Sequence, residues 1–339
     1  MARERRERIP FVWHNAHLFG ISILLMSYCD PNTISMWIKY VVLALFLLNC
    51  VDMFIAMYQT WKIPEVKSCR DCYALITGTT SGIGREMTYI LAQKGFSLIL
   101  VARREDVLER MRVEIEASYK NQVITFKADL STEKGIESLI SFIEEKKLVI
   151  DILINNAGAS YLETFQNLTK AQVSELITLN WEAVVHLTRA IIPQMVSRQR
   201  GHILNVASVS AAGPMPYMAL YSGLKAAVDT FTQALSFELR GSNVIATSFC
   251  PGPVNTNFFK VSGIEVSVLK NLPFLMLSSK DCAKAGIEAM FRNQVCAYDT
   301  LMSQVAAFLL RAVVPTRLRL MILAIVTQDS NKIWDNIKR

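Results

Sequence analysis

The stretch YALITGTTSGIG, residues 73–84, joins a run of β-forming residues to a glycine-rich turn. Helix-forming residues follow at once, so the pattern predicts a strand, a tight turn and a helix. Gly78, Gly82 and Gly84 allow a tight turn and a close approach of the backbone to a ligand, and the next helix presents amide hydrogens to a pyrophosphate. A glycine-rich turn alone is a structural turn by default. Its strand–turn–helix context favours a dinucleotide-binding turn.

The same alternation of strand and helix continues for about 190 residues. After the first strand, the predicted strands are SLILVAR, VITFKADL, IDILINNAG, GHILNVAS and VIATSFCPGPV. Their near-continuous apolar character is typical of parallel strands that are buried on both faces. Because no proline- or glycine-rich linker divides the series, it predicts a single α/β domain over residues 71–300, with a Rossmann-type, doubly wound parallel sheet.

The end of the second predicted strand is the position where a dinucleotide-binding domain selects its cofactor. An acidic side chain there would bond the ribose 2′-hydroxyl of NAD, but the chain has Ala102, Arg103 and Arg104, with no carboxylate before Glu105. Two guanidinium groups can pair with a 2′-phosphate, which favours NADP(H). The alternative is that both arginines are merely solvated at a helix start, where their charge opposes the helix dipole.

The segment YSGLK places Tyr221 and Lys225 four residues apart, on one face of a predicted helix. A ketone that accepts hydride needs a proton, and a free tyrosine, with a pKa of about 10, is a weak partner at neutral pH. An adjacent Lys225 ammonium would lower the phenol pKa. Ser208 ends a predicted strand and can hold a carbonyl oxygen, with Ser210 as a competing candidate. Taken singly, Ser208 could equally be a cap and Tyr221 a core residue.

The motifs TGTTSGIG, NNAG, a serine after a strand, YSGLK and PGPVNT occur in that order between about residues 72 and 260. In this the chain resembles the short-chain dehydrogenase/reductase superfamily. The resemblance implies a catalytic set of Asn180, Ser208, Tyr221 and Lys225. It also implies that Lys225 bonds the nicotinamide ribose and that Asn180 anchors a water in a proton relay.

The resemblance implies a set of cofactor-binding residues as well. They are Gly78, Thr80, Ser81, Gly82, Ile83 and Gly84 in the turn; Arg103 and Arg104; Asp129 and Leu130 at the adenine; Asn155, Ala157 and Gly158 by the adenosine ribose; Pro251, Gly252, Val254 and Thr256 at the nicotinamide; and Tyr221 and Lys225. No metal site is expected, because the single CxxC of Cys69 and Cys72 lacks a second pair.

The N-terminal sequence is strongly apolar. Between Arg8 and Asp30 there is no formal charge, and this length can span a bilayer. A second apolar region, with its core at residues 41–51, is interrupted by Asp52, whose carboxylate costs about 2.5–3.5 kcal/mol near the centre of a membrane helix. One or two membrane helices are therefore expected.

We expect residues 1–70 to form a membrane anchor with helices at roughly 11–28 and 34–57. Basic residues flank both ends of this region, and both flanks can face the cytosol only if the region forms a hairpin. The expected location is the membrane of the endoplasmic reticulum, with the catalytic domain in the cytosol. The sequon-like Asn167 would then stay unmodified.

The C-terminal residues 301–339 contain a further apolar stretch, VAAFLLRAVVPTRLRLMILAIV, through which Arg311, Arg317 and Arg319 are spaced. Pro315 breaks this region into two helices that are each too short to span a bilayer. A segment lying in the membrane interface, a dimer contact and a core helix remain open as interpretations. The resemblance also places a variable substrate lid after residue 260, and the chain is apolar there.

Composition limits the function. Apolar residues make up 52% of the chain and charged residues 19%. The net charge is +7, but apart from ARERRER at the N-terminus the basic residues are scattered, and no run of them is interleaved with aromatic residues, so nucleic acid is a poor partner. The leading hypothesis is a membrane-bound, NADPH-dependent oxidoreductase that reduces a ketone, or oxidises the alcohol, on a lipophilic substrate such as a steroid, retinoid or fatty-acyl derivative.

Two alternatives are a 3-ketoacyl-CoA or 3-ketosphinganine reductase, and a non-catalytic NADP(H)- or lipid-binding scaffold. A scaffold would be expected to lose the catalytic tyrosine, lysine or serine, and the chain retains all three. Within the superfamily the chain is similar to the membrane-bound dehydrogenase/reductase member 7 and 11β-hydroxysteroid dehydrogenase group. A homodimer is expected.

Overall fold

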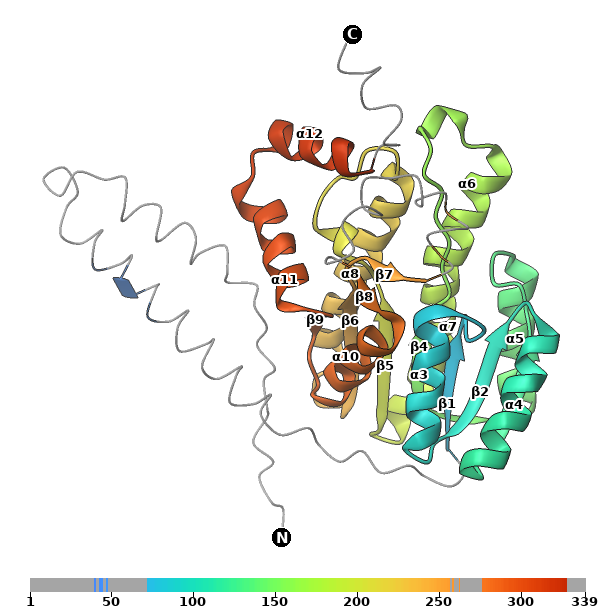
Figure 1. Ribbon diagram of the computed structural model, residues 1–339. Coiled ribbons are helices and arrows are strands. Elements are labelled where there is room, and N and C mark those ends of the chain that lie inside the picture. Colours follow the sequence, from blue (N-terminus) through green and yellow to red (C-terminus); the bar gives the residue numbers. More distant parts are fainter. Residues whose placement is uncertain are drawn as a thin grey trace, which may run out of the picture.

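The computed structural model describes residues 72–256, 258, 262 and 276–327, together with 40, 43, 44 and 47. Seven strands form one parallel sheet in the order β3-β2-β1-β4-β5-β6-β9 (Figure 1). These strands are β1 (Cys72–Thr77), β2 (Ser97–Ala102), β3 (Val123–Lys127), β4 (Val149–Asn155), β5 (Gly201–Val206), β6 (Val244–Cys250) and β9 (Cys296–Tyr298). The strand order reverses between β1 and β4, and the carboxyl ends of these two strands are where a doubly wound sheet binds its ligands.

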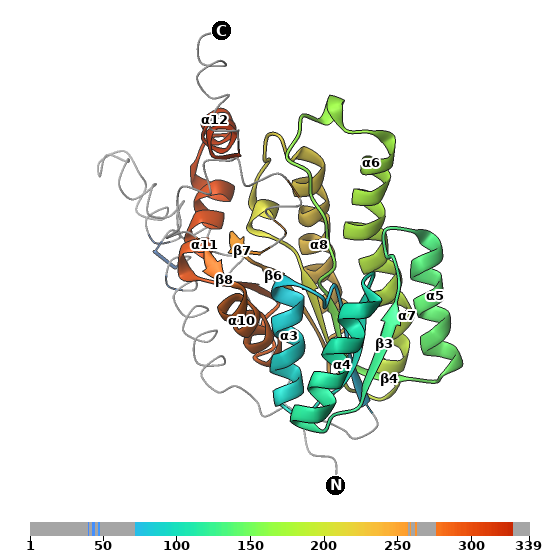
Figure 2. The ribbon, with the colours of Figure 1, turned by 45° about the vertical axis from the view of Figure 1, so that its right-hand side comes forward.

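Helices cover both faces of the sheet (Figures 1 and 2). One apolar core lies between the sheet and α3, α4 and α10, and a second lies between the sheet and α5, α7 and α8. The helices are α3 (Gly82–Gln93), α4 (Glu105–Tyr119), α5 (Glu133–Glu145), α6 (Lys170–Ile177), α7 (Ala183–Ser197), α8 (Ala219–Glu238), α10 (Ser279–Phe291), α11 (Leu301–Phe308) and α12 (Thr316–Thr327). The predicted Rossmann-type parallel sheet is thereby confirmed.

All six strands expected from the sequence are present. The seventh, β9, was not predicted, because its three residues are too short for a recognisable pattern and it forms only by pairing with β6. A small two-stranded sheet of β7 (Val254–Asn255) and β8 (Leu277–Ser278) was also missed, for the same reason.

The C-terminal residues pack against the sheet domain, at the β9 side (Figure 1). As expected from Pro315, they form two short helices; α11 runs into a π-helical turn at Leu309–Val313, and α12 begins at Thr316. Arg311 extends from that turn to Asp229 of α8, with Nη2 2.6 Å from Oδ2 of a carboxylate that is almost fully buried.

Among the residues that the structure describes, no helix combines the length and the apolar character needed to cross a bilayer. The membrane anchor expected at residues 1–70, with its helices at 11–28 and 34–57, lies outside the described residues apart from four single positions. The apolar region expected after residue 260 also lies outside them as far as residue 275, with the exception of Ser262.

Candidate active site

The glycine-rich turn connects β1 to α3 at the carboxyl edge of the sheet. Gly78 has a φ of 71°, which favours glycine, and a Cβ added to it would lie 2.9 Å from Asn156 Nδ2. A Cβ added to Gly84 would overlap both Asn156 Nδ2 and the Gly78 carbonyl oxygen. The turn therefore folds so tightly that two of its three glycines are required by their contacts.

Asn156 braces this turn from the next strand of the sheet. Its Nδ2 donates to the Thr77 carbonyl oxygen at 2.9 Å, and its backbone N–H donates to Thr77 Oγ1 at 3.0 Å. The Thr77 hydroxyl in turn donates to the Ile154 carbonyl oxygen. Sequence reasoning missed Thr77 and Asn156; the second asparagine of NNAG was the available signal, since a polar side chain directly after a buried strand needs a partner.

Arg103 and Arg104 follow β2 and are both exposed. Arg104 Nη2 donates to the Thr80 carbonyl oxygen at 2.8 Å, which ties the end of β2 to the glycine turn. The guanidinium of Arg103 lies close enough to Tyr161 to influence the pKa of that phenol. The two arginines therefore stand beside the turn, as the sequence predicted, although Arg104 already uses part of its guanidinium on the backbone.

The remaining predicted contacts on the adenine side divide into two groups. Asp129 is exposed after β3 and accepts from Ser131 Oγ at 2.7 Å, which leaves its second carboxylate oxygen available. Asn155 is buried, and its amide donates to Asn205 and Thr188 within the protein interior. The Asn155 amide nitrogen therefore joins β4 to β5 and α7, whereas its buried Oδ1 has no partner within the described residues.

Side chains of three further predicted residues serve mainly in packing. Leu130 belongs to the second apolar core, against which Ala157 packs, and Ile83 packs against the first core. Their backbone groups stay candidates for cofactor contacts. Ser81 is the residue that precedes α3, and its side chain makes no capping hydrogen bond.

The loop after β6 closes over the glycine turn. The methyl group of Thr256 would lie 3.0 Å from a Cβ added to Gly82, so the two segments are in close contact. Gly252 donates its N–H to Asp299 Oδ2 at 3.0 Å, and Val254 is buried in β7. Pro251 accepts from the Val209 N–H, which links this loop to the segment after β5. The predicted nicotinamide-side residues are thus brought next to both the glycine turn and the serine.

Tyr221 lies in the first turn of α8 and is almost fully buried. The Ser208 side chain, which follows β5, lies beside its phenol, and Ser208 Oγ accepts from the Ser210 N–H at 3.1 Å. Ser210 is buried, and its hydroxyl has no partner within the described part of the chain. Between the two serines that the sequence left open, Ser208 is therefore the one that touches the phenol.

Lys225 is buried one turn after Tyr221. Its Nζ donates to the Val206 carbonyl oxygen at 2.8 Å and lies 5.7 Å from the centre of the Tyr221 ring. Burial lowers the pKa of Lys225 to about 8. Burial also raises the pKa of Tyr221 to about 12, with the Ser208 hydrogen bond acting in the opposite direction. The expectation that Lys225 would lower the phenol pKa is wrong for the protein alone, because desolvation dominates.

Asn180 lies in a π-helical turn, Thr178–Glu182, between α6 and α7. Its Nδ2 donates to the carbonyl oxygens of Ala159 and Leu176 at 3.0 Å, while its fully buried Oδ1 has no hydrogen-bond partner among the residues that the structure describes. A Cβ added to Gly158 would lie 2.9 Å from that oxygen and 3.5 Å from Lys225 Nζ. The unpaired acceptor and the lysine donor therefore border the same small space, and Gly158 keeps it open.

Apolar side chains surround the Tyr221 ring. They form a cluster that consists of Met218, Tyr221, Leu162, Met215 and Phe258. The Phe258 ring lies 5.9 Å from the Tyr221 ring, centre to centre. A substrate that brings a carbonyl group to the phenol would consequently meet hydrocarbon around it.

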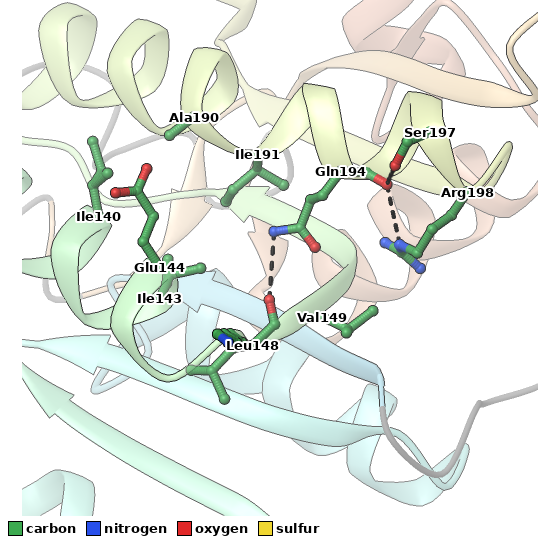
Figure 3. Close-up of a pocket in the computed structure, with 11 residues that line it drawn as sticks. Ile140, Ile143, Glu144, Leu148, Val149, Ala190, Ile191, Gln194, Ser197 and Arg198 are labelled. Atoms are coloured by element: carbon green, nitrogen blue, oxygen red, sulfur yellow. Dashed lines mark hydrogen bonds between the residues drawn. The ribbon is translucent and has the colours of Figure 1, made fainter.

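A pocket of about 260 Å³ lies elsewhere, between α5, the start of β4 and α7 (Figure 3). Gln194 crosses it, with its side chain bonded to the backbone of Leu148 and Ile150. This pocket is at the amino end of β4, and none of the predicted site residues lines it. It is therefore distinct from the candidate active site, where the catalytic and glycine-turn residues converge.

Comparisons with known proteins agree with this geometry. Over 196 residues the chain is 36% identical to very-long-chain 3-oxoacyl-CoA reductase-B of Danio rerio, which covers 56% of this chain and 61% of that protein. It is 31% identical to dehydrogenase/reductase SDR family member 7B of Mus musculus, over 62% of this chain and 66% of that one. The chain thus matches about three fifths of the length of the Danio rerio protein.

A short-chain dehydrogenase from Sphingobium yanoikuyae, solved in complex with NADPH, superposes with a TM-score of 0.63 at 29% identity. The superposition covers 68% of this chain and 88% of that protein. The family model described as short chain dehydrogenase matches residues 73–265, which is more than half of the chain and includes every predicted catalytic residue. The chain therefore belongs to the short-chain dehydrogenase family.

Proposed function

We propose that the protein is an NADP(H)-dependent oxidoreductase that reduces a ketone, or oxidises the corresponding alcohol, on a lipophilic substrate. The observation that carries the proposal is the buried Tyr221 phenol, which lies beside the Ser208 side chain and is enclosed by apolar side chains. The reduction of a ketone needs a proton donor next to the group that binds the carbonyl oxygen. The apolar surroundings favour a hydrocarbon-rich substrate.

The residues present fit a nicotinamide dinucleotide. The glycine turn has room only for backbone at Gly78 and Gly84, and it leads into the N-terminus of α3, where amide groups favour a pyrophosphate. When bound, such a cofactor supplies or accepts the hydride. Arg103 and Arg104 beside the turn support the choice of NADP(H) over NAD, because no carboxylate precedes Glu105 at this strand end.

The protein's own side chains donate the proton and then replace it. A pKa of about 12 keeps Tyr221 protonated throughout the physiological range, which is the form that reduction requires. Ser208 would hold the carbonyl oxygen next to the phenol. After donation, the Tyr221 phenolate would take a proton from Lys225. Lys225 would in turn be reprotonated through a water held by the unpaired Asn180 oxygen, since these two groups border one small space.

The pKa of Lys225 leads to a prediction about pH. Because it is lowered to about 8, the lysine is charged below that value and loses its proton above it. We expect kcat/KM for reduction to be level below pH 8 and to fall at higher pH. Tyr221 stays protonated over the same range and does not set this limb.

The test of this pH dependence is a profile between about pH 6 and pH 10 for the wild type and Lys225→Arg. Arginine keeps its charge up to about pH 12, so the falling limb should disappear from the variant even if its rate is lower. A limb that stays at the same pH in Lys225→Arg would show that another group titrates there.

The arginine pair carries a prediction about cofactor choice. Arg103→Ala should weaken NADPH binding by about tenfold and leave NADH binding nearly unchanged, because only NADPH carries the 2′-phosphate. Arg110→Ala is the matched control; Arg110 is an exposed arginine of α4 that pairs with Asp106 one turn away. Titration of both cofactors against each variant measures the difference, and equal losses for NADPH and NADH would refute the phosphate contact.

The substrate class is proposed from the relatives as well as from the apolar cluster. Two very-long-chain 3-oxoacyl-CoA reductases among them share 36% of aligned residues with this chain. We propose long-chain 3-oxoacyl thioesters as the first substrates to test, ahead of 3-ketosphinganine, steroid and retinoid ketones. A screen of NADPH oxidation over these classes, with the full chain in detergent, decides among them. Tight NADPH binding without oxidation by any class would favour a non-catalytic scaffold instead.

We further propose that residues 1–70 anchor the protein in the membrane of the endoplasmic reticulum, with the catalytic domain in the cytosol and the protein acting as a homodimer. The support for the anchor is the uncharged N-terminal sequence and its basic flanks. In microsomes, Asn167 should therefore remain unglycosylated, and protease added outside should digest the domain. A sugar on Asn167, which lies in an exposed short helical turn, would place the domain in the lumen.

A further inference from the structure

Helices α11 and α12 have two unlike faces. Their inner residues, among them Ser303, Ala307, Leu323 and Thr327, are buried against the sheet domain. Their outer residues are large, apolar and exposed: Met302, Val305 and Leu309 at α11 and the turn after it, and Leu318, Met321 and Ile325 on α12. These six residues are called the outer face below. Met321 alone is 65% exposed, which is unusual for a side chain of this size.

The inner face attaches the helix pair to the candidate active site. Thr327 Oγ1 donates to the Pro216 carbonyl oxygen at 3.0 Å, in the loop that leads into α8 and Tyr221. The Arg319 side chain would lie 3.3 Å from a Cβ added to Gly213 in the same loop. With Arg311 bound to Asp229, α8 and the loop before it are both held by the C-terminal segment. Helices α11 and α12 therefore lie beside α8 and the loop that leads to Tyr221 (Figures 1 and 2).

The charge of this segment indicates what covers the outer face. Residues 300–328 contain three arginines and no aspartate, glutamate or lysine. Arg311 and Arg319 are turned toward the protein, and Arg317 is exposed at the start of α12. An apolar helix face with only positive charge at its edge matches the surface of a bilayer that contains anionic lipids. A soluble protein partner would instead favour a mixed polar rim.

We propose that the outer face of α11 and α12 lies in the interfacial layer of a lipid bilayer and turns the entrance of the site toward the membrane. A lipophilic substrate would then reach Tyr221 from the bilayer without crossing water. The orientation of the entrance rests on the proposed function, whereas the lipid contact does not. Of the interpretations that the sequence left open for this segment, a core helix is excluded by the exposure of its outer residues.

The experiment uses the full chain in vesicles of phosphatidylcholine and phosphatidylserine that contain a photoactivatable phospholipid. After illumination, lipid adducts are measured on tryptic peptides 293–311 and 320–332, which carry most of the outer face. Peptide 113–120 of α4 is the reference, because it contains the exposed Val113 and Tyr119 on another part of the surface. We expect about tenfold more adduct on the two C-terminal peptides than on the reference.

A charged double variant, Met321→Glu with Ile325→Glu, should reduce adducts on both C-terminal peptides to the reference level. Val113→Glu is the matched control and should leave them unchanged. Thermal unfolding of each variant shows whether it is folded, since both positions are on the surface. Adducts at the reference level in the wild type would overturn the proposal.

Two other occupants give different results in the same vesicles. Chemical cross-links between peptides 320–332 of two copies, in place of lipid adducts, would identify a dimer contact and overturn the proposal. Cross-links from this peptide to residues before 72 would identify the N-terminal segment as the cover, with the same consequence. Because the adduct pattern does not depend on turnover, failure of the proposed reaction and failure of the lipid contact are distinguishable.

Discussion

Tyr221→Phe is expected to lower kcat for ketone reduction by about 10²- to 10⁴-fold, the range by which positioned general acids accelerate reactions. The reason is geometric: the phenol is buried beside Ser208, so another group cannot take its place without moving α8. Phenylalanine fills the same apolar cluster and keeps the ring beside Lys225. NADPH affinity should therefore stay within a factor of about three of the wild type.

The controls for this variant separate chemistry from packing. Tyr73→Phe removes a phenol at the start of β1, whose hydroxyl donates to Gln122 far from the candidate site, and should retain full activity. Steady-state rates give kcat, and fluorescence titration gives the NADPH affinity. A Tyr221→Phe enzyme with more than a tenth of the wild-type kcat would remove Tyr221 from the role of proton donor.

Gly84→Ala is expected to produce the other large effect, a loss of NADPH affinity of roughly tenfold to a hundredfold. An added Cβ would overlap Asn156 Nδ2 and the Gly78 carbonyl oxygen, and overpacking of this kind costs about 1–3 kcal/mol. Asn156 Nδ2 and the Gly78 carbonyl oxygen are also the groups that hold the turn in its conformation. The expected response is therefore a shift of the turn away from the position in which its backbone can approach a pyrophosphate.

Gly223→Ala provides a matched control for the same chemical change. Gly223 lies on α8 between Tyr221 and Lys225, and a Cβ added there meets no atom within 4 Å. This variant should bind NADPH normally and be more stable by about 1 kcal/mol, because alanine favours a helix. Isothermal titration and thermal unfolding measure the two quantities. Normal NADPH binding by Gly84→Ala would mean that the turn has a structural role only.

The fold and family were predictable because their signals are local. Strand–turn–helix alternation predicts a parallel sheet, and all six predicted strands are present in one parallel sheet. The ordered motifs identified the family, which the family model confirms over residues 73–265. The resemblance to that family also implied Tyr221, Lys225, Ser208 and Asn180 as the catalytic set, and the structure brings all four to one end of the sheet.

The electrostatics of the site could not be predicted in the same way. The sequence shows that Lys225 follows Tyr221 by one turn, but it does not show that both are buried. Burial acts on each group separately, raising the pKa of the phenol and lowering that of the lysine. The outcome depends on which neighbours exclude water, and these neighbours come from segments far away in the chain.

Polar partners were missed for a related reason. Asn155 and Asn156 are consecutive, yet one is directed into the sheet and the other toward the glycine turn. This difference follows from the alternation of side chains at the end of β4, and the motif NNAG does not state which asparagine serves which purpose. The π-helical turn that orients Asn180 has no sequence signal that we recognise.

The ion pair of Arg311 with Asp229 has a consequence for the biosynthesis of the protein. The two residues are 82 positions apart, and Asp229 belongs to the same helix as Tyr221 and Lys225. Until the ribosome has released Arg311, the catalytic helix carries a buried carboxylate without its cation, and leaving such a charge uncompensated costs about 3–5 kcal/mol. A chain that ends early would therefore hold every catalytic residue and still lack a stably folded catalytic helix.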